Sequence, residues 1–384
     1  MLKRIHLIVL ILAILFSSCK ERDSSNSMNK VVELNVKTAE SIEMKDIISN
    51  VRCVKLENNN NALFNDCWKI RLYNNYIYIY SLTDFAVYIF SDKGEYVNTL
   101  EAGCKGNLTM PIDIMINEKS SELWVINERN TIKRYSPDGK TYLGEIELPF
   151  QVSAIAYYSN EKFLLYDGNF NKEVKGYITL TGFEQKSQRY VYAIKNSDKK
   201  FNSYIPATLF THASNNIIYT LLPNNDTIYL SDIKRGKNFK PLYYLNFGGD
   251  FLNESQWPDN GFNDREYAEM MNSGKYIYGI NSFYSANNKI FFRTQGRYSK
   301  YFMINTKTHQ LFNFNNLIDD LSTKTPATSI QGSAGNDIFF IFDSDYLISH
   351  YQKRGMKSEY PQIEELLKSL GKENHKVVFF CTVK

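Results

Sequence analysis

The chain has 384 residues and a formal charge of +4, from 45 basic and 41 acidic side chains. This balance gives no field suited to nucleic acid, so we expect no nucleic-acid partner. With 43% hydrophobic and 22% charged residues the composition is that of a globular protein. Aromatic residues reach 15%, with only 9 Pro and 19 Gly, which favours a fold rich in β-strands.

The first residues predict export. Lys3 and Arg4 precede an apolar run from Leu7 to Phe16, which has the length of a signal-peptide core but is too short to span a bilayer. The run ends in Phe16-Ser17-Ser18-Cys19, which resembles the lipobox of bacterial lipoproteins. We expect residues 1–18 to be a lipoprotein signal peptide, Cys19 to be lipidated and residues 19–30 to be a flexible tether. The alternative is an ordinary secretory signal.

Four other cysteines are Cys53, Cys67, Cys104 and Cys381. No Cys-x-x-Cys pair occurs, so a structural zinc site is not expected. Buried free thiols are the default interpretation. Cys53 and Cys381 would become a candidate disulfide if their strands were adjacent and their Cα atoms lay within about 7 Å.

An internal repeat indicates the architecture. Tyr78–Gly94 aligns without gaps with Leu123–Gly139 at an offset of 45 residues. Both segments contain two apolar strands and a glycine turn, and a period near this length with several short strands is typical of a propeller blade. The centres of the second strands continue this spacing at Ile79, Trp124, Leu165, Tyr219, Phe292 and Phe340.

These units predict an all-β fold over residues 31–384: a six-bladed β-propeller of four-stranded antiparallel blades with two short helical insertions. One helix is expected within Phe251–Lys275, and the second around Ile363, Leu366, Leu367 and Leu370, which have helical spacing. Val51–Leu56 and Lys376–Cys381 are expected to close the last blade from both chain ends, because an open ring would expose unpaired backbone.

The sequence resembles a family at this point. The matching segments are Met44–Glu57, the blade pattern, Leu148-Pro149-Phe150, Asn225–Tyr229 and Asn374–Lys384. They are similar to those of the six-bladed β-propeller lipoproteins of Bacteroidota cell envelopes, which are related to NHL-repeat propellers. Gly103–Asn107 departs from the glycine-rich stretch with an acidic end that such propellers carry. The resemblance implies a propeller anchored in the envelope, on the outer membrane, and no catalytic residue.

The chemistry-bearing side chains form no motif. The sequence has no His-Glu-x-x-His, Gly-x-Ser-x-Gly or phosphate-binding glycine loop, and we expect no metal or cofactor. A channel site of His212, His309 and His350 is conceivable but less favoured than surface or core histidines. Asp319-Asp320 and the Asp343/Asp345 pair could act in acid–base chemistry, although solvated loop ends are the simpler interpretation.

Loops between the second and third strands of each blade converge on one mouth of a propeller and are the natural ligand-facing set. They predict a ligand-binding ring of Asp84, Arg129, Asn169, Asp226, Arg297, Tyr298 and Asp345. Arg129 and Arg297 are favoured because a guanidinium can grip a carboxylate or vicinal hydroxyls. Trp257 could offer a platform to a sugar, or pack beneath the inserted helix.

Two functions follow. The first is a non-catalytic binding or scaffold protein, held at the envelope by its lipid, for a glycan or a protein partner. The second is a glycoside hydrolase or lyase with paired carboxylates at the mouth. Two carboxylates about 5–9 Å apart over a pocket would favour the hydrolase. The lack of a recognisable nucleophile or metal motif favours the first, and whether the protein is an enzyme stays open.

Overall fold

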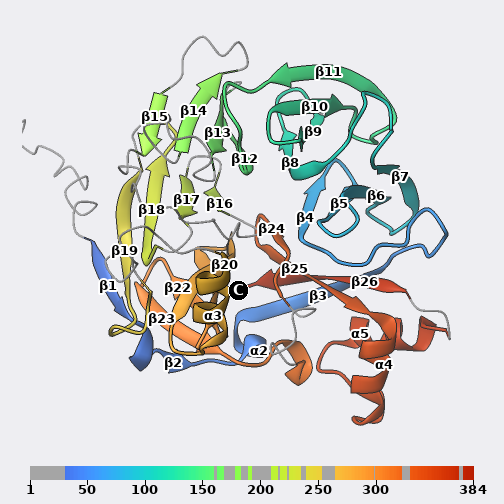
Figure 1. Ribbon diagram of the computed structural model, residues 1–384. Helices are drawn as coiled ribbons and strands as arrows, with labels where there is room; N and C mark the ends of the chain where they lie inside the picture. Colours follow the sequence, from blue (N-terminus) through green and yellow to red (C-terminus); the bar gives the residue numbers. More distant parts are fainter. Residues whose placement is uncertain are drawn as a thin grey trace, which may run out of the picture.

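The computed structural model describes residues 31–159, 162–167, 178–182, 189–192, 209–214, 217–222, 225–234, 239–252, 264–297, 299–321, 329–371 and 375–384. In these residues, small sheets are arranged around a common centre, and this arrangement is a β-propeller (Figure 1). Most strands of each sheet follow one another in the chain as antiparallel neighbours, as the alternation of apolar residues and turns predicted.

Three sheets come from the first half of the chain. The first contains β4 (Lys69–Tyr73), β5 (Tyr76–Ser81), β6 (Ala86–Ser91) and β7 (Tyr96–Leu100). The second contains β8 (Pro111–Asn117), β9 (Glu122–Asn127), β10 (Thr131–Tyr135) and β11 (Tyr142–Glu147). The third contains β12 (Ala154–Ser159), β13 (Lys162–Tyr166), β14 (Ile178–Gly182) and β15 (Arg189–Tyr192).

The second half supplies three more, so that the described residues contain six sheets. One contains β16 (Phe210–Ser214), β17 (Ile217–Leu221), β18 (Thr227–Asp232) and β19 (Lys240–Asn246). The next contains β20 (Ile277–Ala286), β21 (Lys289–Gly296), β22 (Tyr301–Asn305) and β23 (Gln310–Phe314). The last contains β24 (Gly332–Ala334), β25 (Asp337–Asp343), β26 (Lys376–Val383) and, from the start of the chain, β3 (Ile48–Lys55).

The first residues of the propeller run along the outside of three sheets. β1 (Val32–Asn35) pairs in parallel with β19, and β2 (Glu40–Ser41) pairs in parallel with β23. The short η2 (Val36–Thr38) and α2 (Met44–Ile47) lead from one strand to the next. β3 then pairs antiparallel with β26, which confirms that both ends of the propeller share one sheet.

The pairing of β3 with β26 also determines whether Cys53 and Cys381 can form a disulfide. Cys53 lies opposite Phe379, and Cys381 lies opposite Val51. The two cysteines are therefore diagonal neighbours, for which Cα separations of about 7–8 Å exceed the usual disulfide range. Both are free thiols in the structure, contrary to a disulfide. Burial raises the pKa of Cys53 to about 12, so its thiol stays protonated at neutral pH.

All six expected centres of second strands lie in the second strand of their sheet. Both expected helices are present as α3 (Asp264–Asn272) and α5 (Pro361–Ser369). α5 buries Ile363, Leu366 and Leu367, the residues whose spacing predicted it. The second insertion holds a further helix, α4 (Ser344–Gln352), which the sequence did not predict because Asp343–Asp345 reads as a loop end. A short η4 (Ile318–Asp320) precedes β24.

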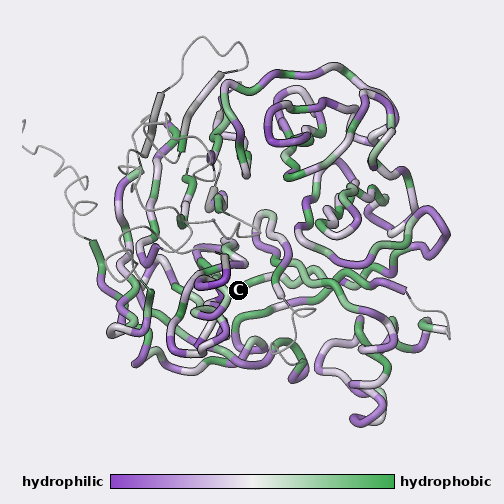
Figure 2. Tube along the Cα trace, in the orientation of Figure 1, coloured by the Kyte–Doolittle hydropathy of each residue, from purple (hydrophilic) through white to green (hydrophobic). Residues whose placement is uncertain are grey.

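The first strand of each sheet lies nearest the centre, and these inner strands form a ring. Contacts join β24 to β4, β4 to β8, β8 to β12, β16 to β20 and β20 to β24. β12 and β16 share a hydrophobic cluster that includes Ala156 and Phe210. Apolar side chains therefore fill every joint between neighbouring sheets, and Figure 2 shows the hydrophobic run along β25 and β26.

Polar bonds also connect neighbouring sheets at the inner ring. Lys69 of β4 forms a buried ion pair with Asp113 of β8, and the same carboxylate accepts from the backbone N–H of Ile155 in β12, 3.1 Å away. The Ser285 hydroxyl of β20 donates to the carbonyl of His212 in β16 at 2.7 Å. These buried polar groups are thus paired with groups from the adjoining sheet, which fixes the angle between blades.

Candidate functional site

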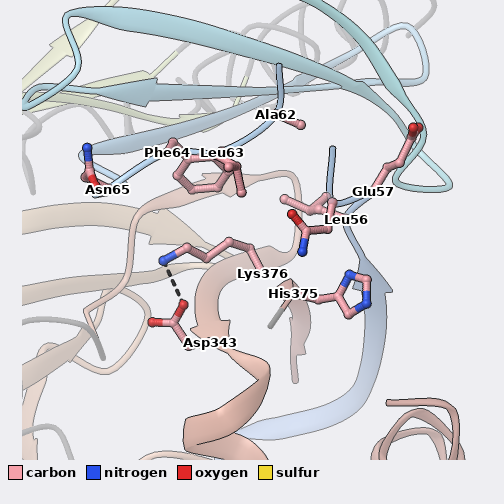
Figure 3. Close-up of a pocket in the computed structure, with 10 residues that line it drawn as sticks. Leu56, Glu57, Ala62, Leu63, Phe64, Asn65, Asp343, His375 and Lys376 are labelled. Carbon is pink, nitrogen blue, oxygen red and sulfur yellow. Dashed lines mark ion pairs between the residues drawn. The ribbon is translucent and has the colours of Figure 1, made fainter. Parts of the chain in front are cut away.

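A pocket of about 460 Å³ opens where the sheet that closes the ring meets the β4–β7 sheet (Figure 3). Its walls come from the segment between β3 and β4, the end of β25 and the start of β26. The lining residues are Leu56, Glu57, Asn58, Ala62, Leu63, Phe64, Asn65, Asp343, His375 and Lys376. Loops that leave a second strand and loops that enter a first strand meet here, which is the face that the sequence indicated for ligand binding.

A partly exposed ion pair lines this pocket. The Lys376 ammonium is 2.7 Å from a carboxylate oxygen of Asp343, and the side chains are 27% and 38% exposed. The two residues are direct partners across β25 and β26. Asp343 also immediately precedes α4, whose N-terminal dipole stabilises a negative charge there. Water therefore reaches both charged groups while their positions are fixed by the sheet.

Apolar side chains face this pair. The Lys376 ammonium lies 5.5 Å from the centre of the Phe64 ring, and Figure 3 shows Phe64 and Leu63 on the other side of Lys376 from Asp343. Phe64 is buried, whereas Leu63 is 60% exposed. The pocket thus combines an accessible pair of opposite charges with an apolar wall.

The second carboxylate of the pocket, Glu57, is held away from the pair (Figure 3). It accepts from the backbone N–H of Tyr96 at 2.7 Å and from the Asn59 amide at 2.9 Å. The hydrogen bond from Tyr96 and then that from Asn59 lower the pKa of Glu57. Its carboxylate is consequently ionised at neutral pH and has no proton to donate.

Two loops at the edge of the pocket are bonded to each other. The Asp84 carboxylate accepts from the backbone N–H of Asn65 at 2.9 Å and from the Ser81 hydroxyl at 2.7 Å. Burial opposes ionisation of Asp84, but hydrogen bonds from Ser81, Asn65 and Tyr88 outweigh it and lower its pKa. The Asp84 carboxylate thus has partners within the chain, and ligand binding by Asp84 stays a prediction.

Phe85 follows Asp84 with a φ of 48°, a left-handed conformation that bulky residues rarely adopt. Such a conformation costs on the order of 1–3 kcal/mol and persists only where neighbouring bonds hold it. The bonds to Asp84 supply that constraint, and the Phe85 side chain remains 41% exposed.

Arg129 and Arg297, the two residues favoured for ligand binding, also have partners in the chain. Arg129 donates to the Ser153 hydroxyl at 2.9 Å. Arg297 pairs with Asp250 at 2.8 Å, and Asp250 also pairs with Lys37 of η2 at 3.0 Å. Both arginines thus connect a loop after a second strand to a segment that enters a sheet. This confirms that the two kinds of loop share a face, while ligand binding by the arginines stays a prediction.

Of the remaining members of the predicted ring, the structure describes Asp226 and Asp345. Asp226 lies between β17 and β18, where burial raises its pKa against the opposing hydrogen bond from Thr227. Asp345 is exposed in the first turn of α4, two residues from the pocket residue Asp343. Asn169 and Tyr298 lie outside the described residues, as do Trp257 and Cys19.

Two of the histidines and the first residue of the acid pair form hydrogen bonds within the chain. His309 bonds the Tyr243 hydroxyl, 2.9 Å away, and His350 bonds the Asp319 carbonyl, also at 2.9 Å, so these two histidines are engaged in different parts of the chain. In the part of the chain that the structure describes, no three His, Cys, Asp or Glu side chains gather as a metal site. Buried Asp319 accepts from the Tyr351 hydroxyl at 2.7 Å and the Glu359 N–H at 3.1 Å, which ties η4 to the helical insertion.

Sequence reasoning missed most of the pocket because its wall is the connection between β3 and β4. That segment reads Glu57-Asn58-Asn59-Asn60-Asn61, then Ala62-Leu63-Phe64. A polar run followed by large apolar residues outside any strand was the available signal. Asp343 was considered only as half of an acid pair, and its actual partner is the base Lys376.

The described sheets form an all-β propeller with a pocket at the joint between two sheets, and its sequence places the chain in a known family. The chain belongs to the family described as a domain of unknown function (DUF4934), whose model matches residues 29–382. No curated protein matches the chain.

Two crystal structures support the fold. One is of a protein of Bacteroides fragilis NCTC 9343 inferred to be exported, with 16% identity, a TM-score of 0.71, and 92% of this chain and 100% of that one covered. The other is a member of the DUF4221 family from Bacteroides vulgatus ATCC 8482, with 9% identity, a TM-score of 0.50, and 88% and 98% covered. These matches do not test the expected kinship with NHL-repeat propellers.

Among the described residues, no helix combines the length and apolar character that crossing a bilayer requires.

Proposed function

We propose that this chain is an envelope-anchored, non-catalytic binding propeller that captures a carbohydrate in the pocket beside Lys376 and Asp343. The observation that carries the proposal is the half-exposed ion pair placed against Leu63 and Phe64. In this proposal the six sheets are the blades of one closed ring, and the pocket uses the joint where the ring closes.

The chemistry of the pair suits a neutral polyol. A sugar hydroxyl both donates and accepts, so neighbouring hydroxyls can donate to the Asp343 carboxylate and accept from the Lys376 ammonium without separating the pair. A charged ligand would have to compete with one partner for the other. The C–H face of a sugar can cover Leu63 and the accessible edge of Phe64, and small-molecule sites usually occupy about 300–1,000 Å³.

Binding is favoured over hydrolysis by the state of Glu57. A glycoside hydrolase needs a carboxylic acid that keeps its proton near neutral pH. Glu57 has a lowered pKa, and the other pocket carboxylate, Asp343, is paired with Lys376. A hydrolase or lyase therefore remains the second candidate.

Envelope anchoring is supported by the lipobox-like Ser17-Ser18-Cys19 and by the structural neighbour inferred to be exported. With Cys19→Ala, the full-length protein should move from the membrane fraction to the soluble fraction. A variant that stays wholly with the membranes would show that the lipid anchor is absent.

The binding experiment uses residues 30–384 and neutral gluco-, manno-, xylo- and galacto-oligosaccharides, screened on an array and measured by calorimetry. Asp343→Asn and Lys376→Met should each weaken binding at least tenfold. The matched control is Glu145→Gln, because Glu145 is also a half-exposed carboxylate paired with a lysine, on β11. Absence of binding to all four series, or variants that bind like the wild type, would refute the proposal.

A further inference from the structure

Two exposed apolar side chains belong to two loops that are bonded to each other beside the pocket. Among the described residues, five large apolar side chains are exposed, and Leu63 at 60% and Phe85 at 41% are two of them. The other three are Val31, Leu143 and Tyr244. Single exposed apolar residues are common on protein surfaces, but two on bonded loops beside a cavity call for a reason. We call Leu63 and Phe85 the apolar lip.

Hydrogen bonds join the two loops that carry the apolar lip. Leu63 lies two residues before Asn65, whose backbone N–H and side-chain amide both donate to the Asp84 carboxylate, and Phe85 is the next residue after Asp84. The Ser81 hydroxyl donates to Asp66 as well, so the two loops are joined at a second point. The left-handed backbone at Phe85 indicates that the conformation of this turn is enforced by the loops.

We propose that the apolar lip is a second sugar-binding position, so that the ligand is an oligosaccharide with one unit on the Lys376–Asp343 pair and the next against Phe85 and Leu63. This inference rests on the proposed function. An exposed aromatic ring and an aliphatic side chain match the C–H faces of a pyranose.

Two features favour a sugar chain over a protein partner. Leu63 and Asn65 both line the pocket, and Asn65 is bonded to Asp84, the residue before Phe85. The lip also contains only two apolar side chains, whereas stable protein interfaces bury about 1,200–2,000 Å². A ligand that extends by one or two units from the pocket is matched to this size.

The test compares oligosaccharides of one to five units from the same four neutral series, with residues 30–384 and calorimetry or ligand-observed NMR. In the wild type, affinity should rise at least tenfold from one unit to two or three. Phe85→Ala should remove most of that rise and leave the affinity for the single unit within about twofold. Tyr244→Ala, which changes an exposed aromatic residue on β19, is the control and should leave the series unchanged.

Phe85→Asn provides a second variant, because Asn adopts the left-handed conformation readily and keeps the turn while removing the ring. It should reproduce the loss seen with Phe85→Ala. Equal affinity at all lengths, or an equal loss for one unit and for longer chains, would overturn the second position while leaving the pocket intact. If no series binds at any length, the proposed function fails together with the inference.

Discussion

Two Lys–Asp ion pairs lie at neighbouring joints of the propeller, and they differ mainly in burial. Lys69 and Asp113, between the β4–β7 and β8–β11 sheets, are 5% and 4% exposed. Lys376 and Asp343, at the joint where the ring closes, are 27% and 38% exposed. The same two functional groups thus occupy an almost dry site and a solvated one.

The two pairs also differ in the groups that surround them. Asp113 also accepts from the backbone N–H groups of Ile114 at 2.8 Å and Ile155 at 3.1 Å, so its carboxylate joins three inner strands. Burial lowers the pKa of Lys69 against the opposing attraction of Asp113. A pair with these bonds serves the fold, whereas the pair at the pocket retains access to solvent. Burial, more than residue type, separates the structural pair from the pair proposed to bind a ligand.

The largest expected effect comes from breaking the buried pair. Asp113→Ala leaves the Lys69 ammonium buried without a partner and removes the acceptor of the Ile155 N–H. Loss of one member of a buried pair typically costs about 3–5 kcal/mol. Urea unfolding of residues 30–384 measures it, and a cost below about 1 kcal/mol would mean that the pair does not hold the joint.

A smaller cost is expected when both charges are removed. Lys69→Met combined with Asp113→Leu fills similar volume and leaves no buried charge, and such replacements are often neutral or stabilising. Here the N–H groups of Ile114 and Ile155 still lose their acceptor, so we expect a remaining cost of about 1–3 kcal/mol. The same unfolding measurement tests this, and a double variant less stable than Asp113→Ala would show that desolvation of Lys69 is not the dominant penalty.

The inner ring also contains a titratable histidine. His212 of β16 is accessible to solvent, yet desolvation by the surrounding chain and then the Arg71 guanidinium lower its pKa to about 4, against a hydrogen bond to the Tyr157 carbonyl. In the unfolded state the His212 imidazole becomes protonated near pH 6.5, whereas in the folded state it becomes protonated only near pH 4.

The free energy of unfolding should therefore fall as the pH drops from about 6.5 to 4. His212→Gln should make its pH dependence weaker over this range. Thermal unfolding of both proteins between pH 7.5 and 4.5 isolates the contribution of His212, since other groups titrate equally in the two. Parallel curves for wild type and variant would contradict the lowered pKa.

Much of the fold was predictable because local chemistry repeats. Alternating apolar strands with glycine turns located Ile79, Trp124 and the other second-strand centres. The helical spacing of Ile363, Leu366 and Leu367 located α5. The β3–β26 pairing followed from the need to cover an open edge.

The site was less predictable because it depends on contacts between distant segments. Asp343 and Lys376 are separated by the helical insertion, and they meet only through the register of β25 with β26. Arg129, Arg297 and Asp84 were placed on the correct face, but their partners Ser153, Asp250 and Asn65 come from connections whose paths no periodic pattern describes. The diagonal offset of Cys53 and Cys381 likewise required the register.

The smallest effect on stability is expected at the pocket. Asp343→Asn removes one charge of a pair that water already reaches, and exposed pairs contribute about 0–1 kcal/mol. The cost should shrink further in 0.5 M salt because screening weakens solvated charges but not buried ones. Urea unfolding of Asp343→Asn and Asp113→Ala, each at low and high salt, compares the two pairs directly. If Asp343→Asn costs as much as Asp113→Ala, and salt changes neither, then the Lys376–Asp343 pair holds the closing joint, and loss of oligosaccharide binding in that variant would reflect a damaged fold. A small, salt-sensitive cost combined with a tenfold loss of binding would instead separate the two pairs as the comparison requires: one that fixes the angle between blades, and one that is free to exchange its water for a ligand.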